Sequence, residues 1–228
     1  MANGPVDPRW PKLLSLSVHE FRSPLTVVGG YLRMLLKESA GPLGTSQRRL
    51  LEEAERGCGR LSALLVEISD LANLEGDKAT FNRQPTDLRS VLKETVAQLP
   101  PLPDREVRIE MTLADGPAAL TGDPTRLRTA LGAVLMALRR ELVTSDCLLV
   151  REAANGGPAA CDLRIGDPDT LEAIEAERED LPVFDEWRGG CGLSLPVARR
   201  VIEAHGGRIW SAPGGRRAGA RILLPVNG

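Results

Sequence analysis

Two long stretches of this 228-residue chain carry the same apolar repeat, and they constrain its fold more than any other feature. Apolar side chains recur at alternating steps of four and three from about residue 10 to 38 and again from residue 51 to 72, which is typical of helices packed on helices. Gly41-Pro42-Leu43-Gly44 interrupts the repeat, and so short a loop favours antiparallel neighbours. The repeat consists of Leu14, Val18, Phe21, Leu25, Val28, Leu32 and Leu35, then Leu51, Ala54, Cys58, Leu61, Leu65, Ile68 and Ala72.

A single hairpin of this kind would leave much of its apolar seam in contact with water. A second copy would cover the seam and create a four-helix bundle, because identical chains associate most often through two-fold symmetry. We therefore expect residues 1–80 to form an antiparallel helical hairpin and the chain to be a homodimer with a dimeric four-helix bundle.

The repeat stops between Gly76 and Pro85, which places a domain boundary in this region. Residues 81–228 change to short mixed elements. Asp123-Pro124 predicts the start of a helix, with Asp as the N-cap and Pro at the first helical position. The apolar face of that helix would consist of Leu127, Leu131, Val134, Leu135 and Leu138.

The other elements of the second part predict a sandwich. Thr86 is expected to cap another helix, and Gly206-Gly207 should end a helix of about 192–205. The turn Asn155-Gly156-Gly157 should join two strands as a hairpin. The strand-like runs are 107–113, 147–153, 160–166, 208–211 and 220–226. Helices with a mostly antiparallel sheet give an α/β sandwich of two layers.

The composition excludes several classes of partner. With 29 basic and 31 acidic residues the net charge is only −2, so nothing favours nucleic acid or an anionic membrane. No stretch approaches the roughly 20 apolar residues of a membrane-spanning helix, the first residues lack the apolar core of a signal peptide, and we expect a cytoplasmic protein. The cysteines form no CxxC pair and are expected to be reduced and structural; they are Cys58, Cys147, Cys161 and Cys191.

A histidine with a neighbouring acid lies within the first predicted helix. His19 follows the seam residue Val18 by one position, so it should lie on the flank of the bundle, partly in water. A neutral imidazole is a nucleophile, and Glu20 can orient the ring or take its proton. Pro24 removes an N–H and crowds the carbonyl of Glu20, so the helix should bend one turn beyond the histidine.

The run His-Glu-Phe-Arg-Ser-Pro-Leu at residues 19–25 resembles the H-box of the dimerisation and histidine-phosphotransfer domain of two-component sensor histidine kinases. The resemblance implies that His19 is the phosphoacceptor and Glu20 its base. It also places Ser23 where family members with phosphatase activity keep a Thr or Asn to orient water. Partners implied by the resemblance are a second copy of the chain and the receiver domains of response regulators.

The second part, residues 81–228, resembles the ATP-binding domain of the same family, which implies an α/β sandwich of the histidine kinase ATPase type. Gly190-Cys191-Gly192-Leu193-Ser194-Leu195 resembles the G2 box, Gly-Thr-Gly-Leu-Gly-Leu, where N–H groups at a helix N-terminus receive phosphates. Ser194 replaces the third glycine. His205 follows in the run Glu-Ala-His-Gly-Gly-Arg-Ile-Trp, and we expect it to be a helix C-terminal residue favoured by the dipole, without a catalytic role.

The metal-binding motif of the family is altered. Gly122-Asp123-Pro124 resembles the start of the N-box helix, but the Asn positions of the family fall on Ala133 and Ala137. A methyl group cannot bind a cation that needs oxygen donors, so we expect no metal site.

The nucleotide-binding loops are altered as well. Asp167 matches the first residue of the G1 box, Asp-x-Gly-x-Gly, as a possible adenine contact, but Asp169 and Leu171 replace its glycines. Only five residues separate Phe184 from Gly190, where active members carry a longer lid over ATP. The vestigial nucleotide-binding residues implied by the resemblance are Asp123, Asp167, Gly190 and Gly192.

An intact H-box beside an altered nucleotide site leads to three hypotheses. In the first, the chain is a phosphotransferase of a phosphorelay: His19 takes a phosphoryl group from an aspartyl phosphate on one receiver domain and gives it to another, without a cofactor of its own. The second is a divergent histidine kinase that uses ATP and Mg²⁺. The third is a non-enzymatic protein that binds a response regulator or heterodimerises with a sensor kinase.

Overall fold

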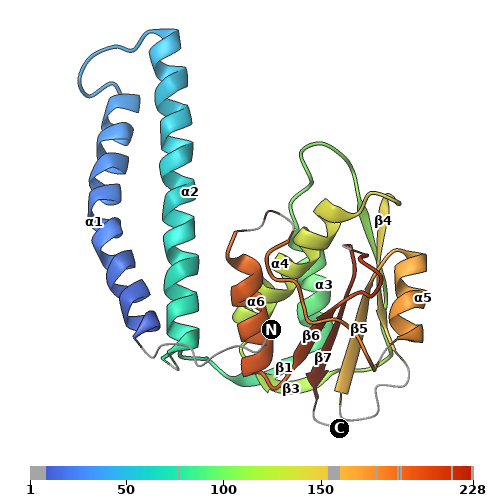
Figure 1. Cartoon of the computed structure of the whole chain (residues 1–228). Helices are drawn as coiled ribbons and strands as arrows, with labels where there is room; N and C mark the ends of the chain where they lie inside the picture. Colours follow the sequence, from blue (N-terminus) through green and yellow to red (C-terminus); the bar gives the residue numbers. More distant parts are fainter. Residues whose placement is uncertain are drawn as a thin grey trace. The chain divides into compact units, whose positions relative to one another are not determined.

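The computed structural model describes residues 9–76, 78–153, 160–177, 179–188, 190, 192–216 and 218–226 (Figure 1). The chain divides into two compact units, Met1–Ala79 and Thr80–Gly228, called here the hairpin unit and the α/β unit. None of the helices in the described part of the chain combines the length and the apolar character that a bilayer crossing requires. The fold is therefore a helical hairpin followed by an α/β domain, as the sequence predicts.

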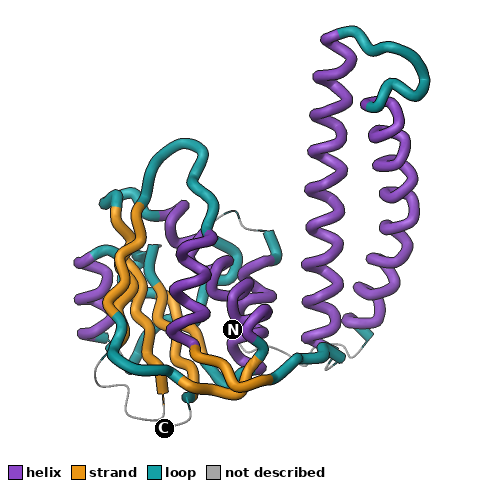
Figure 2. Tube along the Cα trace, turned by 180° about the vertical axis from the view of Figure 1, so that it is seen from behind, coloured by secondary structure: helices purple, strands orange, loops and turns teal. Residues whose placement is uncertain are grey.

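The hairpin unit consists of two antiparallel helices, α1 (Trp10–Leu36) and α2 (Thr45–Glu75), joined by a short loop (Figures 1 and 2). They approach closely at Gly29, where an added Cβ would lie 3.3 Å from the Sγ atom of Cys58. The Cys58 thiol donates to the carbonyl oxygen of Leu25 at 3.6 Å. The absence of a side chain at Gly29 thus allows the two helices to approach closely in the second half of α1.

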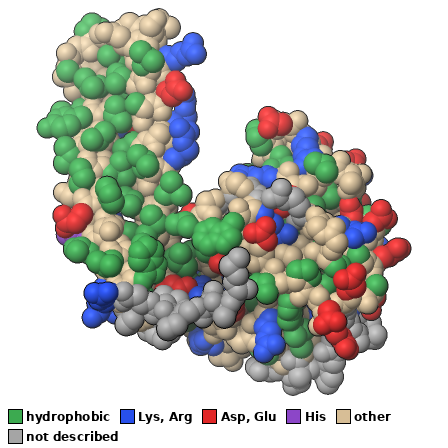
Figure 3. Space-filling view, in the orientation of Figure 1, with side chains coloured by type: hydrophobic (Ala, Val, Ile, Leu, Met, Phe, Trp, Pro, Cys, Tyr) green, Lys and Arg blue, Asp and Glu red, His purple; other side chains and the backbone are tan. Residues whose placement is uncertain are grey.

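The predicted seam is only partly buried within one hairpin. Val18 is buried, whereas Phe21 is 62% and Val28 51% exposed. Figure 3 shows apolar side chains spread over the visible face of the hairpin. A hairpin of two helices cannot surround such a seam, because each helix has only one neighbour. Further exposed large apolar side chains of the unit are Trp10, Leu13, Leu16, Val27, Tyr31, Met34, Leu50, Leu61, Leu64 and Val66.

The α/β unit contains a five-stranded sheet in the order β2-β4-β5-β7-β6. Its strands are β2 (Arg108–Thr112), β4 (Cys147–Glu152), β5 (Ala160–Gly166), β6 (Arg208–Ser211) and β7 (Ala220–Pro225). Only the β2–β4 pair is parallel, and the other pairs are antiparallel. A separate antiparallel pair is formed by β1 (Gln84–Asp87) and β3 (Ala119–Gly122).

Helices cover both faces of this sheet. Figures 1 and 2 show α3 (Leu88–Gln98), α4 (Pro124–Glu141) and α6 (Ser194–Ala204) on one face and the short α5 (Pro168–Ala176) on the other. The predicted apolar face of α4 is confirmed, because its side chains are at most 1% exposed; they are Leu127, Leu131, Val134, Leu135 and Leu138. They face a sheet whose buried side chains include Leu148, Val150, Leu163, Ile165 and Ile222.

Two sequence expectations about helix starts have different outcomes. Asp123 caps α4 as predicted, since its Oδ1 accepts the N–H of Arg126 at 3.0 Å. Thr86 was the expected cap of α3 and is not: it lies within β1, and Asp87 accepts the N–H of Arg89 at 3.1 Å. An aspartate accepts such bonds at least as well as a threonine. The predicted turn at 155–157 lies outside the described residues, although the two strands that flank it are antiparallel neighbours.

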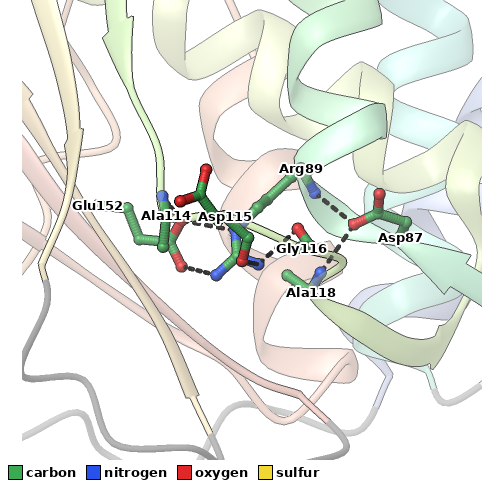
Figure 4. Close-up of polar contacts among 7 residues, drawn as sticks. All are labelled: Asp87, Arg89, Ala114, Asp115, Gly116, Ala118 and Glu152. Carbon is green, nitrogen blue, oxygen red and sulfur yellow. Dashed lines mark hydrogen bonds and ion pairs between the residues drawn. The ribbon is translucent and has the colours of Figure 1, made fainter.

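A buried ion pair ties the loop between β2 and β3 to the sheet (Figure 4). Arg89 donates from Nε and Nη2 to the two carboxylate oxygens of Glu152 at 2.7 and 2.6 Å. Its Nη1 donates to the carbonyl oxygens of Asp115 and Gly116 at 3.2 and 2.8 Å, and the N–H of Ala114 donates to Glu152 at 3.0 Å. The Arg89 guanidinium holds the pKa of Glu152 below its ordinary value. The loop conformation therefore depends on this pair.

The first prediction concerns this ion pair. Glu152→Ala should lower the free energy of unfolding of the α/β unit by about 3 kcal/mol, because Arg89 would remain buried without its counter-charge. Urea unfolding followed by circular dichroism would measure the loss. The control Glu94→Ala removes the partner of Arg128 from an exposed pair and should cost at most about 1 kcal/mol. Equal losses in the two variants would contradict the role given to Glu152.

Candidate functional site

The His19–Glu20 pair lies on the solvent-facing side of α1. The His19 side chain is 83% exposed, one position from the buried Val18, as the heptad pattern predicts. Its Nδ1 atom lies 3.4 Å from Oε1 of Glu20. A ring with its proton on Nδ1 points that N–H at the carboxylate and carries the nucleophilic lone pair on Nε2. This geometry suits attack by Nε2 on an incoming electrophile.

Ser23 and Pro24 lie one turn beyond this pair, and α1 continues through the proline to Leu36. Ser23 is exposed and follows His19 by four positions, so the two side chains are neighbours on the helix surface. Pro24 has no N–H to donate to the carbonyl of Glu20, which removes one helical hydrogen bond at this point. The three predicted residues His19, Glu20 and Ser23 are thus brought together by helical spacing alone.

Asp123 has a structural task at the start of α4. It is buried, and its carboxylate accepts the N–H groups of Arg126 at 3.0 Å and Asn82 at 2.9 Å. Burial raises its pKa, but these hydrogen bonds and the charge of Arg126 outweigh burial, and the net pKa lies below the ordinary value. Asp123 is therefore a charged cap of α4.

Asp167 caps α5 in the same way. Its Oδ1 accepts the N–H of Thr170 at 2.8 Å, and its Oδ2 accepts the hydroxyl of Thr144. Burial raises its pKa, whereas these hydrogen bonds lower it, with a net pKa below the ordinary value. Thr144 follows α4 and Asp123 precedes it, and a helix of 18 residues is about 27 Å long. The two predicted aspartates consequently do not share a site.

A cavity of about 440 Å³ lies beside Asp167. It is bounded by the end of α4, the start of α5 and the loop before β7, through Glu141, Val143, Thr144, Asp167, Thr170, Gly215, Arg216 and Ala218. The first turn of α5 packs tightly here: a Cβ on Gly166 or Gly219 would lie 2.7 or 2.3 Å from Cγ2 of Thr170. The chain thus places a helix where the resemblance expects a glycine-rich loop.

The predicted G2 glycines lie elsewhere. Gly190 and Gly192 have φ angles of 57° and 61°, a left-handed conformation that favours glycine. The Gly190 carbonyl oxygen accepts a hydrogen bond from Arg140 at 3.4 Å. Neither glycine lines the cavity beside Asp167, and Cys191 lies outside the described residues.

The short segment that replaces the lid is held to the sheet. The N–H of Asp185 donates to Oγ of Ser211 at 2.9 Å, and Arg188 donates from both terminal nitrogens to the carbonyl oxygen of Gly219 at 3.3 Å. The Arg188 guanidinium also lies 4.7 Å from the ring centroid of Phe184. These contacts hold the segment against Ser211 of β6 and the carbonyl oxygen of Gly219 before β7.

His205 ends α6 as predicted, but the reason given by the sequence is wrong. It is 6% exposed; Nε2 accepts the N–H of Asp123 at 2.9 Å, and Nδ1–H donates to the carbonyl oxygen of Val201 at 2.7 Å. This pattern requires the neutral ring, and burial lowers its pKa below the ordinary value. A helix dipole would favour a charged ring, so hydrogen bonding and not the dipole holds His205.

Sequence reasoning missed α5 and the threonines that it brings to Asp167. A signal was present, because Asp167-Pro168 repeats the Asp-Pro start of α4 and is followed by Leu171 and Ile174 at helical spacing. The resemblance to the G1 box assigned Asp167 to a nucleotide loop, and the helix-start signal was therefore missed. Thr144 carried no such signal, since its contact with Asp167 joins residues 23 positions apart.

An exposed His-Glu pair on a helical hairpin, followed by an α/β sandwich, is the arrangement of the histidine kinase class of signalling proteins. Residues 12–77 match the family described as His Kinase A (phospho-acceptor) domain. The chain is 27% identical to the circadian input-output histidine kinase CikA of Synechococcus elongatus, over 87% of this chain and 27% of the relative. It is 29% identical to the signal transduction histidine-protein kinase BarA of Escherichia coli K12, over 84% of this chain and 22% of that relative.

Solved structures agree in fold. Full-length ShkA in complex with AMPPNP superposes with a TM-score of 0.67 at 22% identity, over 95% of this chain and 45% of that one. The histidine kinase AdeS of Acinetobacter baumannii superposes with a TM-score of 0.57 at 20% identity, over 92% of this chain and 98% of that one. Residues 12–77 thus match a phospho-acceptor domain family, and most of the chain is similar to sensor histidine kinases. It spans about a quarter of the length of the curated relatives named above.

The second prediction tests Asp167 as a cap. Its pKa lies below the ordinary value, so its stabilising contribution is complete above the unfolded-state pKa of about 4 and is lost as the pH falls through the folded-state pKa. Asp167→Ala should lower the free energy of unfolding by about 1–2 kcal/mol at pH 7, and the difference from wild type should shrink below about pH 4.

Urea unfolding without nucleotide would measure this difference. Asp169→Ala, an exposed residue two positions further along α5, is the control and should cost less than about 1 kcal/mol. If Asp167 were only a ligand contact, its replacement would leave the nucleotide-free protein as stable as the wild type.

Proposed function

We propose that this chain is a phosphotransferase of a two-component phosphorelay, in which His19 exchanges a phosphoryl group with receiver-domain aspartates and does not take it from ATP. The observation that carries the proposal is an exposed His19–Glu20 pair combined with a helix, α5, that begins where the resemblance expects a glycine-rich nucleotide loop. The domain match supports the phosphoacceptor role of His19, because that residue lies within the matched phospho-acceptor domain.

The proposed transfer step uses the two nitrogens of His19 differently. The Nε2 lone pair attacks phosphorus, the P–N bond forms, and the P–O bond to the receiver aspartate breaks, which restores the aspartate carboxylate. The ring becomes positively charged in this step, and its Nδ1 proton can pass to Glu20, whose Oε1 is 3.4 Å away, or to water. Transfer to a second receiver reverses the same events.

Three features of the described residues support the proposal that the chain does not use a magnesium-bound nucleoside triphosphate. Ala137 stands at the expected metal-binding position, is buried and has no oxygen donor. Both carboxylate oxygens of Asp167 already accept hydrogen bonds from Thr170 and Thr144. The segment ending in Arg188, where a lid would lie, is bonded to Gly219. These observations support a donor other than ATP.

A homodimer is part of this proposal. The exposed apolar side chains of α1 and α2 are too numerous for a surface that remains in water, and an apolar groove of about 290 Å³ runs between the helices. A second hairpin would cover both and complete a four-helix bundle. The groove is lined by Phe21, Leu25, Leu61, Leu64, Leu65 and Ile68.

A divergent ATP-dependent kinase is the second candidate, and one observation favours it. The cavity of about 440 Å³ beside Asp167 has the volume of a small-ligand site. The relatives named above are kinases, and ShkA was crystallised with AMPPNP. A nucleotide-binding measurement separates the two candidates.

The third prediction concerns transfer to His19. A panel of purified receiver domains, each phosphorylated with radiolabelled acetyl phosphate, should contain at least one that passes its label to the chain. Acid-labile label should appear in the wild type and in Ser15→Ala, which changes an exposed residue one turn before His19. His19→Ala should carry none, and Glu20→Gln should accept it about 100-fold more slowly. Label that survives His19→Ala would refute the assignment.

The fourth prediction concerns ATP. Calorimetric titration of the wild-type chain with ATP, with and without Mg²⁺, should give no dissociation constant tighter than about 1 mM, because no described residue replaces the missing metal ligand. Incubation with radiolabelled ATP and Mg²⁺ should leave His19 unlabelled. Micromolar, magnesium-dependent binding with labelling of His19 would instead establish the kinase candidate.

A further inference from the structure

The first residues of the α/β unit form a strap that is held where the start of α4 meets the end of α6. The strap is defined as residues 81–83. The N–H of Asn82 donates to Oδ2 of Asp123 at the start of α4, and Arg83 donates to the carbonyl oxygen of Ala204 at the end of α6 at 2.6 Å. The side chains of Asn82 and Arg83 are exposed, whereas the Asp123 carboxylate that accepts the Asn82 N–H is buried.

Phe81 anchors the strap on His205. The two rings meet edge to face with centroids 5.3 Å apart. The guanidinium groups of Arg83 and Arg126 lie 5.5 and 5.1 Å from the Phe81 centroid. The histidine is closely enclosed, since a Cβ on Gly122 would lie 2.9 Å from its Cδ2 atom. The strap is thus held on a buried imidazole whose two nitrogens are both used.

The charge on His205 decides whether this arrangement persists. A protonated ring would point Nε2–H at the N–H of Asp123, so that two donors face each other and the acceptor is lost. It would add a positive charge beside Arg83 and Arg126, and the Asp123 carboxylate would attract it. The ring is buried, and the Asp123 carboxylate makes no direct hydrogen bond to it. The charged ring is therefore disfavoured while the strap is bound.

The strap also governs the connection to the hairpin unit. The N–H groups of Lys78 and Ala79 donate to the carbonyl oxygen of Asn73 at 2.8 and 3.1 Å, so Ala79 is held to the end of α2. Thr80 alone separates it from the strap. With the strap bound, the chain between Ala79 and Phe81 reaches about 7 Å; with residues 81–83 released, the reach to the start of β1 becomes about 17 Å.

We propose that the strap is a proton-sensitive clasp: protonation of His205 releases residues 81–83 and lengthens the tether between the hairpin unit and the α/β unit. The clasp responds to acidification below the ordinary pKa range of histidine, because the neutral ring is the form that binds the strap. It requires neither ATP nor a phosphoryl donor, and it stands whichever function His19 serves.

The fifth prediction tests the clasp by amide hydrogen exchange, expressed as protection factors so that the pH dependence of intrinsic exchange is removed. Between pH 7.5 and 5.5, protection of the Asn82 amide in the full chain should fall several-fold, up to about the tenfold limit set by one histidine, while Leu163 in β5 keeps its protection. His205→Gln cannot be protonated, and its Asn82 protection should not change with pH. Phe81→Ala should show low protection at both pH values.

His19→Gln serves as the matched control, because His19 is the other histidine of the chain and lies outside the clasp. It should reproduce the wild-type pH dependence and leave the His205 ring as the single imidazole signal in a nuclear magnetic resonance titration. Constant protection of Asn82 while that signal titrates, or full pH dependence in His205→Gln, would overturn the proposal.

The ring titration tests the clasp even if His205→Gln fails to fold, because it is carried out on His19→Gln. In His19→Gln the midpoint of the His205 signal and that of the Asn82 protection should coincide. Midpoints that differ by a pH unit or more would overturn the clasp. Loss of Leu163 protection together with that of Asn82 would also overturn it, because the whole unit would then be unfolding.

Discussion

The buried face of α4 is the constraint around which the α/β unit is organised. Five side chains of this helix are almost completely removed from water, and burial of each contributes about 1.5–3 kcal/mol. Because the helix is fixed by that face, its two ends lie at fixed places. Asp123 at its start holds α4, His205 and Asn82, whereas Thr144 beyond its end binds Asp167. The strap and the cavity are therefore arranged by one helix.

The two capping aspartates show how residues that a family resemblance assigns to nucleotide binding can serve as helix caps. Each precedes a proline at the first helical position, and each accepts a backbone N–H three residues further on. A carboxylate engaged in this way is held charged, as the lowered pKa of both residues indicates. In Asp167 the second oxygen is also occupied, by Thr144. This use of the carboxylate supports a donor other than ATP for His19.

The two histidines of the chain have opposite environments. His19 is exposed beside a carboxylate, where a macromolecular partner can reach the ring. His205 is enclosed, with an N–H donor on one nitrogen and a carbonyl acceptor on the other, so proton uptake requires movement of its neighbours. One residue type therefore provides an accessible side chain in the hairpin unit and a support for the strap in the α/β unit.

The sequence by itself determined the features that depend on near neighbours. The heptad repeat predicted the two long helices, the Asp123-Pro124 pair predicted the start of α4, and the run around His19 predicted an exposed nucleophile next to an acid. Only the tertiary structure decided that Phe21 stays exposed, that Asp123 and Asp167 lie at opposite ends of α4, and that His205 is neutral. The physical reason is that burial and hydrogen-bond partners are supplied by residues distant in the chain, such as the 82 positions between Asp123 and His205, and no local pattern records them.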